Sequence, residues 1–305
     1  MTLENHSLEH AIEVYLLRTD VEGKSPNTVV AYRETLGMFL EVAREQGFAG
    51  DVGYITAEHI YAYLGWVKDR GVSDHTRHRR FREARFLFVW LERIGAIEEN
   101  PFKHIRNIRL PQKVIQPFSP EEIRRMLERE FSTPVMTARN RAIIMLLLDT
   151  GIRLNELVSL RLGDVDAGRQ RLRILNGKGK KQRVVGVGDG SLAVLRDYLE
   201  LRGSEAGPLF VSRFGKAMNG HSVSVMMRRL GKWTGIRKLH PHRFRHTFAT
   251  WAIESEAREI DVQYLLGHSS PAMVRRYSAT YDAEKAARAH AKWSPGDRLA
   301  GGEDS

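Results

Sequence analysis

The helical periodicity of this 305-residue chain stops after residue 98 and resumes only at about residue 118. Three prolines interrupt the stretch: Pro101, Pro111 and Pro117. Proline lacks a backbone N–H and its ring clashes with the preceding turn, so an unbroken helix cannot run through it. Such a segment is typical of a boundary between domains. We therefore predict a first domain over 1–100, an interdomain linker over 101–118, a second domain over 119–293 and a disordered tail over 294–305.

The first domain is predicted to be entirely helical. Apolar residues recur at helical spacing in four segments between residues 8 and 95. Ser25 and Pro26 are the residue types of an N-cap and a first helical position. Glycines, which readily adopt the conformation of a helix end, follow three of the segments: Gly47, Gly71 and Gly95. Four helices with short connections predict a compact N-terminal domain.

The second domain is predicted to combine helices with one β-hairpin. It begins with a capping box over 119–122. A period of two over 171–176 and 183–187, joined by a turn with two glycines, indicates antiparallel strands. Helices are predicted at about 119–130, 139–150, 191–202, 221–234, 242–255, 259–266, 271–279 and 282–292. The predicted fold class is mainly α with a small β-hairpin or sheet, an α+β arrangement in the second of two domains.

The charge of the chain points to an anionic partner. Basic residues outnumber acidic ones, 48 to 37, and the formal net charge of +11 is unevenly distributed. Residues 1–67 carry a net −6, residues 68–110 a net +5 and residues 111–305 a net +12. Nucleic acid is the commonest polyanion that such a surface binds, although a basic face can also be merely solvated.

Several classes of protein are excluded or disfavoured by composition. The chain has no cysteine, which excludes disulfides, thiolate metal sites and cysteine nucleophiles. It contains no apolar run near the roughly 20 residues that span a bilayer, and its N-terminus does not resemble a signal peptide. We expect a soluble protein that lies in the cytoplasm, away from membranes. With DNA as its partner, it would lie at the nucleoid.

A first chemical motif lies over 240–247, where a helix is predicted to begin near Pro241. His242 and Arg245 are three residues apart, so both side chains leave one face of that helix near its N-terminus. A helix N-terminus favours an oxyanion, and an arginine there can bind two phosphate oxygens at once. By itself, such a pair is usually only part of a surface.

A second motif lies over 150–157. Arg153 follows an apolar helix that ends at Gly151, and Glu156 stands three residues further on. An arginine that emerges from buried surroundings needs an anionic partner. The partner is either a bound anion or a local carboxylate, Glu156 or Asp149.

Two further motifs come from the rest of the second domain. Gly267 and His268 end one helix, a Ser-Ser-Pro sequence starts another, and Tyr277 follows nine residues after His268. The tip of the predicted hairpin carries three lysines, which are either solvated or close on a DNA backbone: Lys178, Lys180 and Lys181.

In this order and spacing, the motifs resemble the tyrosine site-specific recombinases, the lambda-integrase or Xer-type family. The resemblance covers residues 8–292 and includes Ser25, Thr28, Tyr32, Leu36 and Phe39 of the first domain. It implies a core-DNA-binding domain followed by a catalytic domain. It also implies a site-specific recombinase that cleaves and rejoins DNA through a 3′-phosphotyrosine and a four-way junction.

The resemblance also implies a role for each motif residue. Arg153 and Arg245 would bind the scissile phosphate, Lys178 would donate a proton, His242 and His268 would complete the pocket, and Tyr277 would be the nucleophile. Glu156 would orient the first arginine. Two choices stay open, Lys178 or Lys180 as the acid and Tyr277 or Tyr281 as the nucleophile.

The implied partner is double-stranded DNA with inverted core sites. The protein would bind it as a homotetramer, be largely monomeric in free solution and work with accessory proteins in some settings, and the Ala-rich segment 282–293 would dock into a neighbouring protomer. The sequence has neither an ATP-binding glycine loop nor a carboxylate cluster for two metals, so no cofactor and no metal is expected. A type IB topoisomerase and a non-catalytic DNA-binding module are the competing interpretations.

DNA contacts outside the reaction centre are predicted on both domains. Arg77 and Arg80 lie three residues apart on the fourth predicted helix, next to Arg79 and Arg82. Four arginines within six positions cannot all share one face, so some of them are only solvated. The second domain adds Lys180, Lys181 and Arg243 as further candidate DNA contacts.

Overall fold

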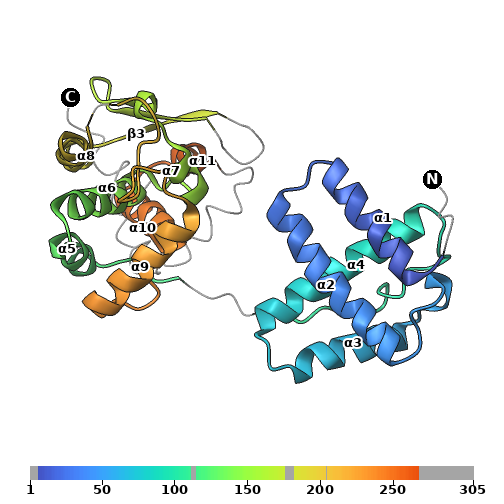
Figure 1. Cartoon of the computed structure of the whole chain (residues 1–305). Coiled ribbons are helices and arrows are strands. Elements are labelled where there is room, and N and C mark those ends of the chain that lie inside the picture. The colour runs from blue at the N-terminus through green and yellow to red at the C-terminus, as the bar shows by residue number, and fades with distance from the viewer. Residues whose placement is uncertain (1–5, 111–114, 176–181, 204, 268–305) are drawn as a thin grey trace, which may run out of the picture. The chain divides into compact units, whose positions relative to one another are not determined.

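The computed structural model of the chain describes residues 6–110, 115–175, 182–203 and 205–267 (Figure 1). Its contacts divide the chain into two units, Met1–Gln112 and Lys113–Ser305. The helices predicted over 271–279 and 282–292, and the predicted tail, lie outside the described residues. None of the helices in the described segments is long and apolar enough to cross a membrane.

The first unit consists of helices, as predicted. They are α1 (Leu8–Val21), α2 (Pro26–Glu45), the short 3-10 helix η1 (Val52–Tyr54), α3 (Ala57–Asp69) and α4 (Asp74–Arg93). Serine side chains at 7, 25 and 73 accept a backbone N–H at the starts of α1, α2 and α4. The core is aromatic at its centre: Phe39 meets Tyr63 and Phe88 edge-on, with ring centroids 5.0 and 5.6 Å apart.

The predicted linker begins and ends within packed segments. Phe102 and Ile105 are buried in the core of the first unit, where the ring of Phe102 lies 5.2 Å from that of Phe81. Phe118 is buried in the core of the second unit, with its ring 4.7 Å from that of Phe244. The linker between the two cores is therefore shorter than the predicted 101–118, because residues at both ends of that range belong to a core.

The second unit is also mainly helical. Its elements are α5 (Pro120–Glu128), α6 (Pro134–Thr150), α7 (Leu154–Ser159), η2 (Leu162–Asp164), β1 (Val165–Asp166), β2 (Arg171–Ile174), β3 (Arg183–Gly186), α8 (Asp189–Arg202), α9 (Gly220–Thr234), α10 (Pro241–Glu254) and α11 (Glu259–Leu266). Helix α6 is apolar on most of its surface because it packs against both α8 and α10 (Figure 1). It begins five residues earlier than predicted, since the Thr133 side chain caps it and Pro134 occupies its first turn.

The strands form a small antiparallel sheet in the order β1-β2-β3. Leu172 pairs with Val185 across the predicted hairpin, and both side chains are buried. The strand β1, only two residues long, was not predicted; its Val165 pairs with Leu172. The fold class is confirmed: mainly helical, with a small sheet in the second unit.

Candidate active site

The turn after α6 brings the second motif close to two other helices. Gly151 ends α6 with a φ of +59°, which favours glycine. A Cβ atom at Gly151 would lie 2.5 Å from the Phe248 ring of α10 and 2.7 Å from Leu266 of α11. Only glycine allows this approach, and the turn leads directly to Arg153.

Arg153 pairs with Glu156 at the start of α7. The Arg153 backbone N–H donates to Oε2 of Glu156 at 2.8 Å, and Arg153 Nη1 lies 3.0 Å from Oε1. Of the two local carboxylates that the sequence offered as partners, Glu156 is therefore the one that binds Arg153. The other candidate partner, Asp149, instead accepts the backbone N–H of Gly188 at 2.8 Å.

A third arginine, Arg183 of β3, binds the same carboxylate, and its role was not predicted. Its Nη1 and Nη2 lie 2.9 and 2.7 Å from Oε1 and Oε2 of Glu156, in a bidentate pair buried on both sides. The sequence does hold a signal for it. The alternation along β3 places Arg183 on the buried face with Val185, where an unpaired arginine would be costly.

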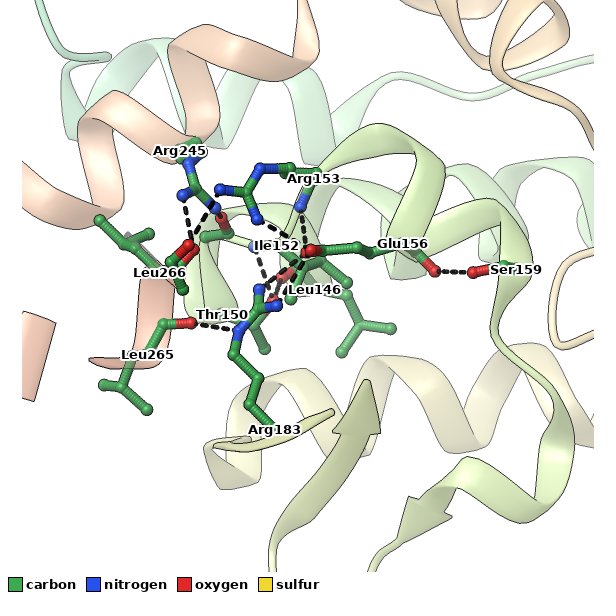
Figure 2. Close-up of polar contacts among 12 residues, drawn as sticks. Leu146, Thr150, Ile152, Arg153, Glu156, Ser159, Arg183, Arg245, Leu265 and Leu266 are labelled. Carbon is green, nitrogen blue, oxygen red and sulfur yellow. Dashed lines mark hydrogen bonds and ion pairs between the residues drawn. The ribbon is translucent and has the colours of Figure 1, made fainter. Parts of the chain in front are cut away.

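The C-terminal end of α11 joins the arginines into one cluster (Figure 2). Three consecutive carbonyls each accept from a different guanidinium. Arg183 Nε donates to the Leu265 carbonyl at 2.7 Å, Arg245 Nη2 to that of Leu266 at 2.6 Å, and Arg153 Nη2 to that of Gly267 at 3.2 Å. The carbonyls at a helix C-terminus lack intrahelical partners and carry partial negative charge.

Arg245 reaches this cluster from α10 and is almost fully buried. Its Nη1 donates to the Gly151 carbonyl at 2.8 Å, so the glycine turn also helps to hold Arg245. Arg153 and Arg245, predicted on separate motifs 92 residues apart in the sequence, therefore contact adjacent carbonyls of one helix end.

The cluster brings three arginine side chains to one place. In the part of the chain that the structure describes, the ion pairs join Arg153 and Arg183 to the single carboxylate of Glu156, and Arg245 lies beside them. Three guanidinium groups thus gather around the Glu156 carboxylate and the carbonyls at the end of α11. The Arg153 side chain remains 29% exposed. The Arg153 guanidinium is therefore accessible from solvent.

The electrostatics keep Glu156 ionised. Burial alone would raise the pKa of its carboxyl, but hydrogen bonds from Arg183 and from the Arg153 backbone outweigh burial and lower that pKa below its usual value. The carboxylate therefore keeps its charge throughout the physiological range and holds both arginines.

The first motif forms the start of α10, as predicted. Pro241 occupies its first turn, and Nδ1 of His240 accepts the Arg243 backbone N–H at 3.2 Å. His242 lies at the surface of this first turn. Partial burial and the positive charge of Arg245 lower the pKa of His242 below its ordinary value. Its imidazole is thus neutral at neutral pH, with one nitrogen to donate and one to accept.

Arg243, a predicted DNA contact, binds several groups within the second unit. Its guanidinium donates to the carbonyls of Gln116 at 3.0 Å, Arg237 at 2.8 Å and Pro117 at 3.2 Å, and it pairs with Glu122 at 2.7 Å. It also lies over the ring of Phe118. These contacts fasten the start of the second unit to α10. Arg243 thus has a structural role in this domain, and its contact with DNA stays a prediction.

The other predicted site residues of the second unit lie outside the described residues: Lys178, Lys180, Lys181, His268, Tyr277 and Tyr281. Within the described segments, no group of three or more His, Asp and Glu side chains is arranged to hold a metal ion.

The buried His246 predicts acid sensitivity of the second unit. It is 4% exposed, its Nδ1 lies 3.0 Å from the Thr250 hydroxyl, and burial lowers its pKa from the ordinary value of 6.5. The unfolded chain therefore binds this proton more readily than the folded one. Stability is retained above about pH 6.5 and lost as the pH falls below it.

Thermal unfolding between pH 8 and pH 5 measures this effect. We expect His246→Gln to reduce the loss of Tm on acidification, whereas His221→Gln, at an exposed site of the same unit, should leave that loss unchanged. An equal acid-induced loss in His246→Gln and wild type would contradict the assignment.

Comparisons with known proteins give matches in both units of the chain. Residues 116–284 match the model of the phage integrase family, and residues 12–95 match the phage integrase N-terminal SAM-like domain. The tyrosine recombinase XerC of Xanthomonas campestris pv. campestris is 32% identical over 271 residues, which cover 88% of this chain and 83% of that protein.

Solved structures extend the likeness over both units. A structure of the XerH site-specific recombinase bound to difH substrate has a TM-score of 0.67 and 26% identity, over 87% of this chain and 79% of that one. The Tn1549 transposon integrase in complex with a circular intermediate DNA has a TM-score of 0.75 over 92% and 98% of the two chains; at 18% identity it shows the shared fold.

These family matches identify an enzyme that breaks and rejoins DNA strands. More particularly, the chain belongs to the phage integrase family of tyrosine recombinases, and its activity is site-specific DNA recombination.

Proposed function

We propose that this recombinase exchanges DNA strands at the arginine cluster, with Arg153 and Arg245 on the scissile phosphate and Tyr277 as the nucleophile. The observation that carries the proposal is the convergence of the two arginines on adjacent carbonyls at the end of α11. Two guanidinium forks at one place suit the two non-bridging oxygens of a phosphodiester. The chain continues from α11 directly into the segment that holds His268 and Tyr277.

In the proposed cleavage step, the Tyr277 oxygen attacks phosphorus. A bond forms between that oxygen and phosphorus, the bond from phosphorus to the 5′-oxygen breaks, and the phenol loses its proton. The 5′-oxygen takes up a proton and leaves as a hydroxyl. Rejoining is the reverse reaction with a 5′-hydroxyl from the partner strand. The phosphodiester energy is kept in the phosphotyrosine, so neither ATP nor another cofactor is required by the scheme.

The arginines would act on the charge that develops in the transition state. Extra negative charge gathers on the non-bridging oxygens, where fixed donors stabilise it. Tyrosine has an ordinary pKa near 10, so positive neighbours are needed to favour the phenolate. His242 and His268 would complete the phosphate pocket, and Lys178, or Lys180 in its place, would protonate the leaving 5′-oxygen.

We further propose that the protein acts as a homotetramer on two DNA sites, each with inverted core half-sites. Strands would be exchanged in pairs through a four-way junction, with accessory proteins in some settings. Free protein would be largely monomeric and would lie with the DNA in the cytoplasm, at the nucleoid.

The product formed from supercoiled DNA distinguishes recombination from the relaxation that a topoisomerase would catalyse. A preferred duplex is first selected by binding from a randomised library, and two copies are placed in one plasmid. We expect deletion or inversion of the intervening DNA without added ATP. Relaxed plasmid with its sequence order unchanged would indicate a type IB topoisomerase, and bound but intact plasmid would indicate a binding module.

Removal of the C-terminal segment is expected to uncouple binding from assembly. Residues 282–293 are Ala-rich, and alanine favours helix but buries little area. We propose that this segment docks into a neighbouring protomer. A chain ending at Thr280 should bind one half-site normally, as measured by gel shift, but lose cooperative filling of a full site and recombine poorly. Cooperative filling and normal recombination by the truncated chain would refute the proposed docking.

Arg77 is the better of the two proposed DNA contacts on α4. Its side chain is 28% exposed and makes only a local pair with Asp74 at 3.0 Å. Arg80 differs, because its Nη1 is buried without a hydrogen-bond partner among the described residues. Arg77→Ala should lower the slope of log Kd against log salt by about 1. Arg93→Ala, at the other end of α4, is the control; an unchanged slope for Arg77→Ala would assign Arg77 to solvent.

A further inference from the structure

Arg183 is a buried arginine for which the proposed reaction has no direct use. All three nitrogens of its guanidinium are engaged within the protein. Nη1 and Nη2 bind the two oxygens of Glu156 at 2.9 and 2.7 Å, and Nε donates to the Leu265 carbonyl at 2.7 Å. Arg183 therefore joins β3 to α7 and to the end of α11 (Figure 2).

Glu156 transmits the position of Arg183 to Arg153. Oε1 of Glu156 accepts from Nη1 of both arginines, and Oε2 accepts from Arg183 Nη2 and from the Arg153 backbone N–H. A carboxylate held by a bidentate partner has one orientation, so both contacts to Arg153 are fixed with it. Without Arg183, the carboxylate would be free to turn and Arg153 would follow it.

Gly267 provides a second connection between the two arginines. A Cβ atom at Gly267 would lie 3.2 Å from Nη1 and 3.3 Å from Cζ of Arg183, and its φ is +61°. The backbone thus closes tightly over the Arg183 guanidinium. The carbonyl of the same glycine accepts from Arg153 Nη2 at 3.2 Å. Among the described residues, Arg183 therefore contacts both groups that accept from the Arg153 guanidinium, Glu156 and Gly267.

Stability alone gives a weak reason for an arginine here. The other inward residues of β2 and β3, such as Ile174 and Val185, are apolar and buried. A buried ion pair is often no more stabilising than well-packed apolar residues of similar volume. What an apolar residue cannot do is fix the orientation of Glu156.

We infer that Arg183 is a positioning residue for strand cleavage. It holds Glu156 and the last turn of α11 so that the Arg153 guanidinium keeps the orientation that meets the scissile phosphate. The inference rests on the proposed function, because the phosphate contact of Arg153 belongs to it.

A double-mutant cycle tests whether Arg183 acts through Arg153. The rate of covalent adduct formation is measured at saturating protein on a nicked duplex, for wild type, Arg183→Met, Arg153→Lys and the double variant. A displacement of a reacting group by about 1 Å can slow a reaction roughly 100-fold. We therefore expect Arg183→Met to slow adduct formation by about this factor, with DNA affinity unchanged. In the Arg153→Lys background, the factor by which Arg183→Met slows adduct formation should be at least about tenfold smaller, because the arginine that Arg183 positions is already absent.

The matched control is Arg139→Met. Arg139 is equally buried in the same unit but binds Asn140 and the Val211 carbonyl, so its substitution should cost the same factor in both backgrounds. If Arg183→Met does not fold, Arg183→Lys replaces it in the cycle, because lysine keeps the charge but not the bidentate geometry.

If the Arg183 substitution slows adduct formation by the same factor in both backgrounds, or in neither, the inference is overturned. Failure of the proposed function is distinguishable, because wild-type protein itself would then form no adduct on the nicked duplex.

Discussion

Replacement of Arg245 by lysine is expected to slow DNA cleavage about 100- to 1,000-fold, the usual effect of removing one donor from the transition state. Arg245 is almost fully buried and already donates to the carbonyls of Gly151 and Leu266. Lysine carries a point charge with no planar fork. It cannot keep both backbone contacts and also bind a phosphate oxygen.

The rate of adduct formation in a single turnover at saturating protein measures this prediction, because binding then does not limit the rate. Arg229→Lys, at an exposed site on α9, is the matched control and should cleave at the wild-type rate. Cleavage by Arg245→Lys within about threefold of wild type would show that Arg245 does not contact the phosphate.

Replacement of Glu156 by alanine is expected to destabilise the second unit by about 3–5 kcal/mol, the usual cost of leaving a buried charge without its partner. Glu156 is 2% exposed, and its loss leaves the buried Arg183 without its carboxylate. Denaturant unfolding measures the free energy. Glu121→Ala, which removes an exposed carboxylate paired with Arg124, should unfold near the wild-type midpoint.

A double variant separates stability from activity at this site. Glu156→Leu combined with Arg183→Met replaces the buried pair by apolar residues, so much of the lost stability should return. Cleavage should stay impaired, because Arg153 still lacks the carboxylate that orients it. A Glu156→Ala protein as stable as wild type would contradict the assigned role of Glu156 as the buried partner of Arg183.

Features that depend on neighbours in the sequence could be predicted well. The Ser25 cap and the terminal glycines of the first unit act within one helical turn, and so does the pairing of Arg153 with Glu156, one of the partners that the sequence offered. The pattern of motifs also led to the correct family. The start of α6 was missed although Thr133 and Pro134 form an ordinary helix start.

The contacts that build the site could not be predicted, because they join distant segments. Arg183 meets Glu156 across 27 residues and the Leu265 carbonyl across 82. The internal contacts of Arg243 could not be predicted for the same reason: its acceptors at Gln116 and Pro117 lie 127 and 126 residues away. Sequence shows the charge of an arginine but not the backbone carbonyls that accept from it after folding.

Identification of the adduct on a nicked duplex tests the central claim most directly. The nick lets the short strand beyond the cleavage point diffuse away, so rejoining fails and the covalent intermediate accumulates. Proteolysis and mass spectrometry then locate the DNA on the protein. We predict a 3′-phosphate joined to Tyr277, absent in Tyr277→Phe, which should still bind the duplex normally. An adduct on Tyr281 or another residue, a 5′-phosphate linkage, or an adduct that persists in Tyr277→Phe would contradict the proposed mechanism.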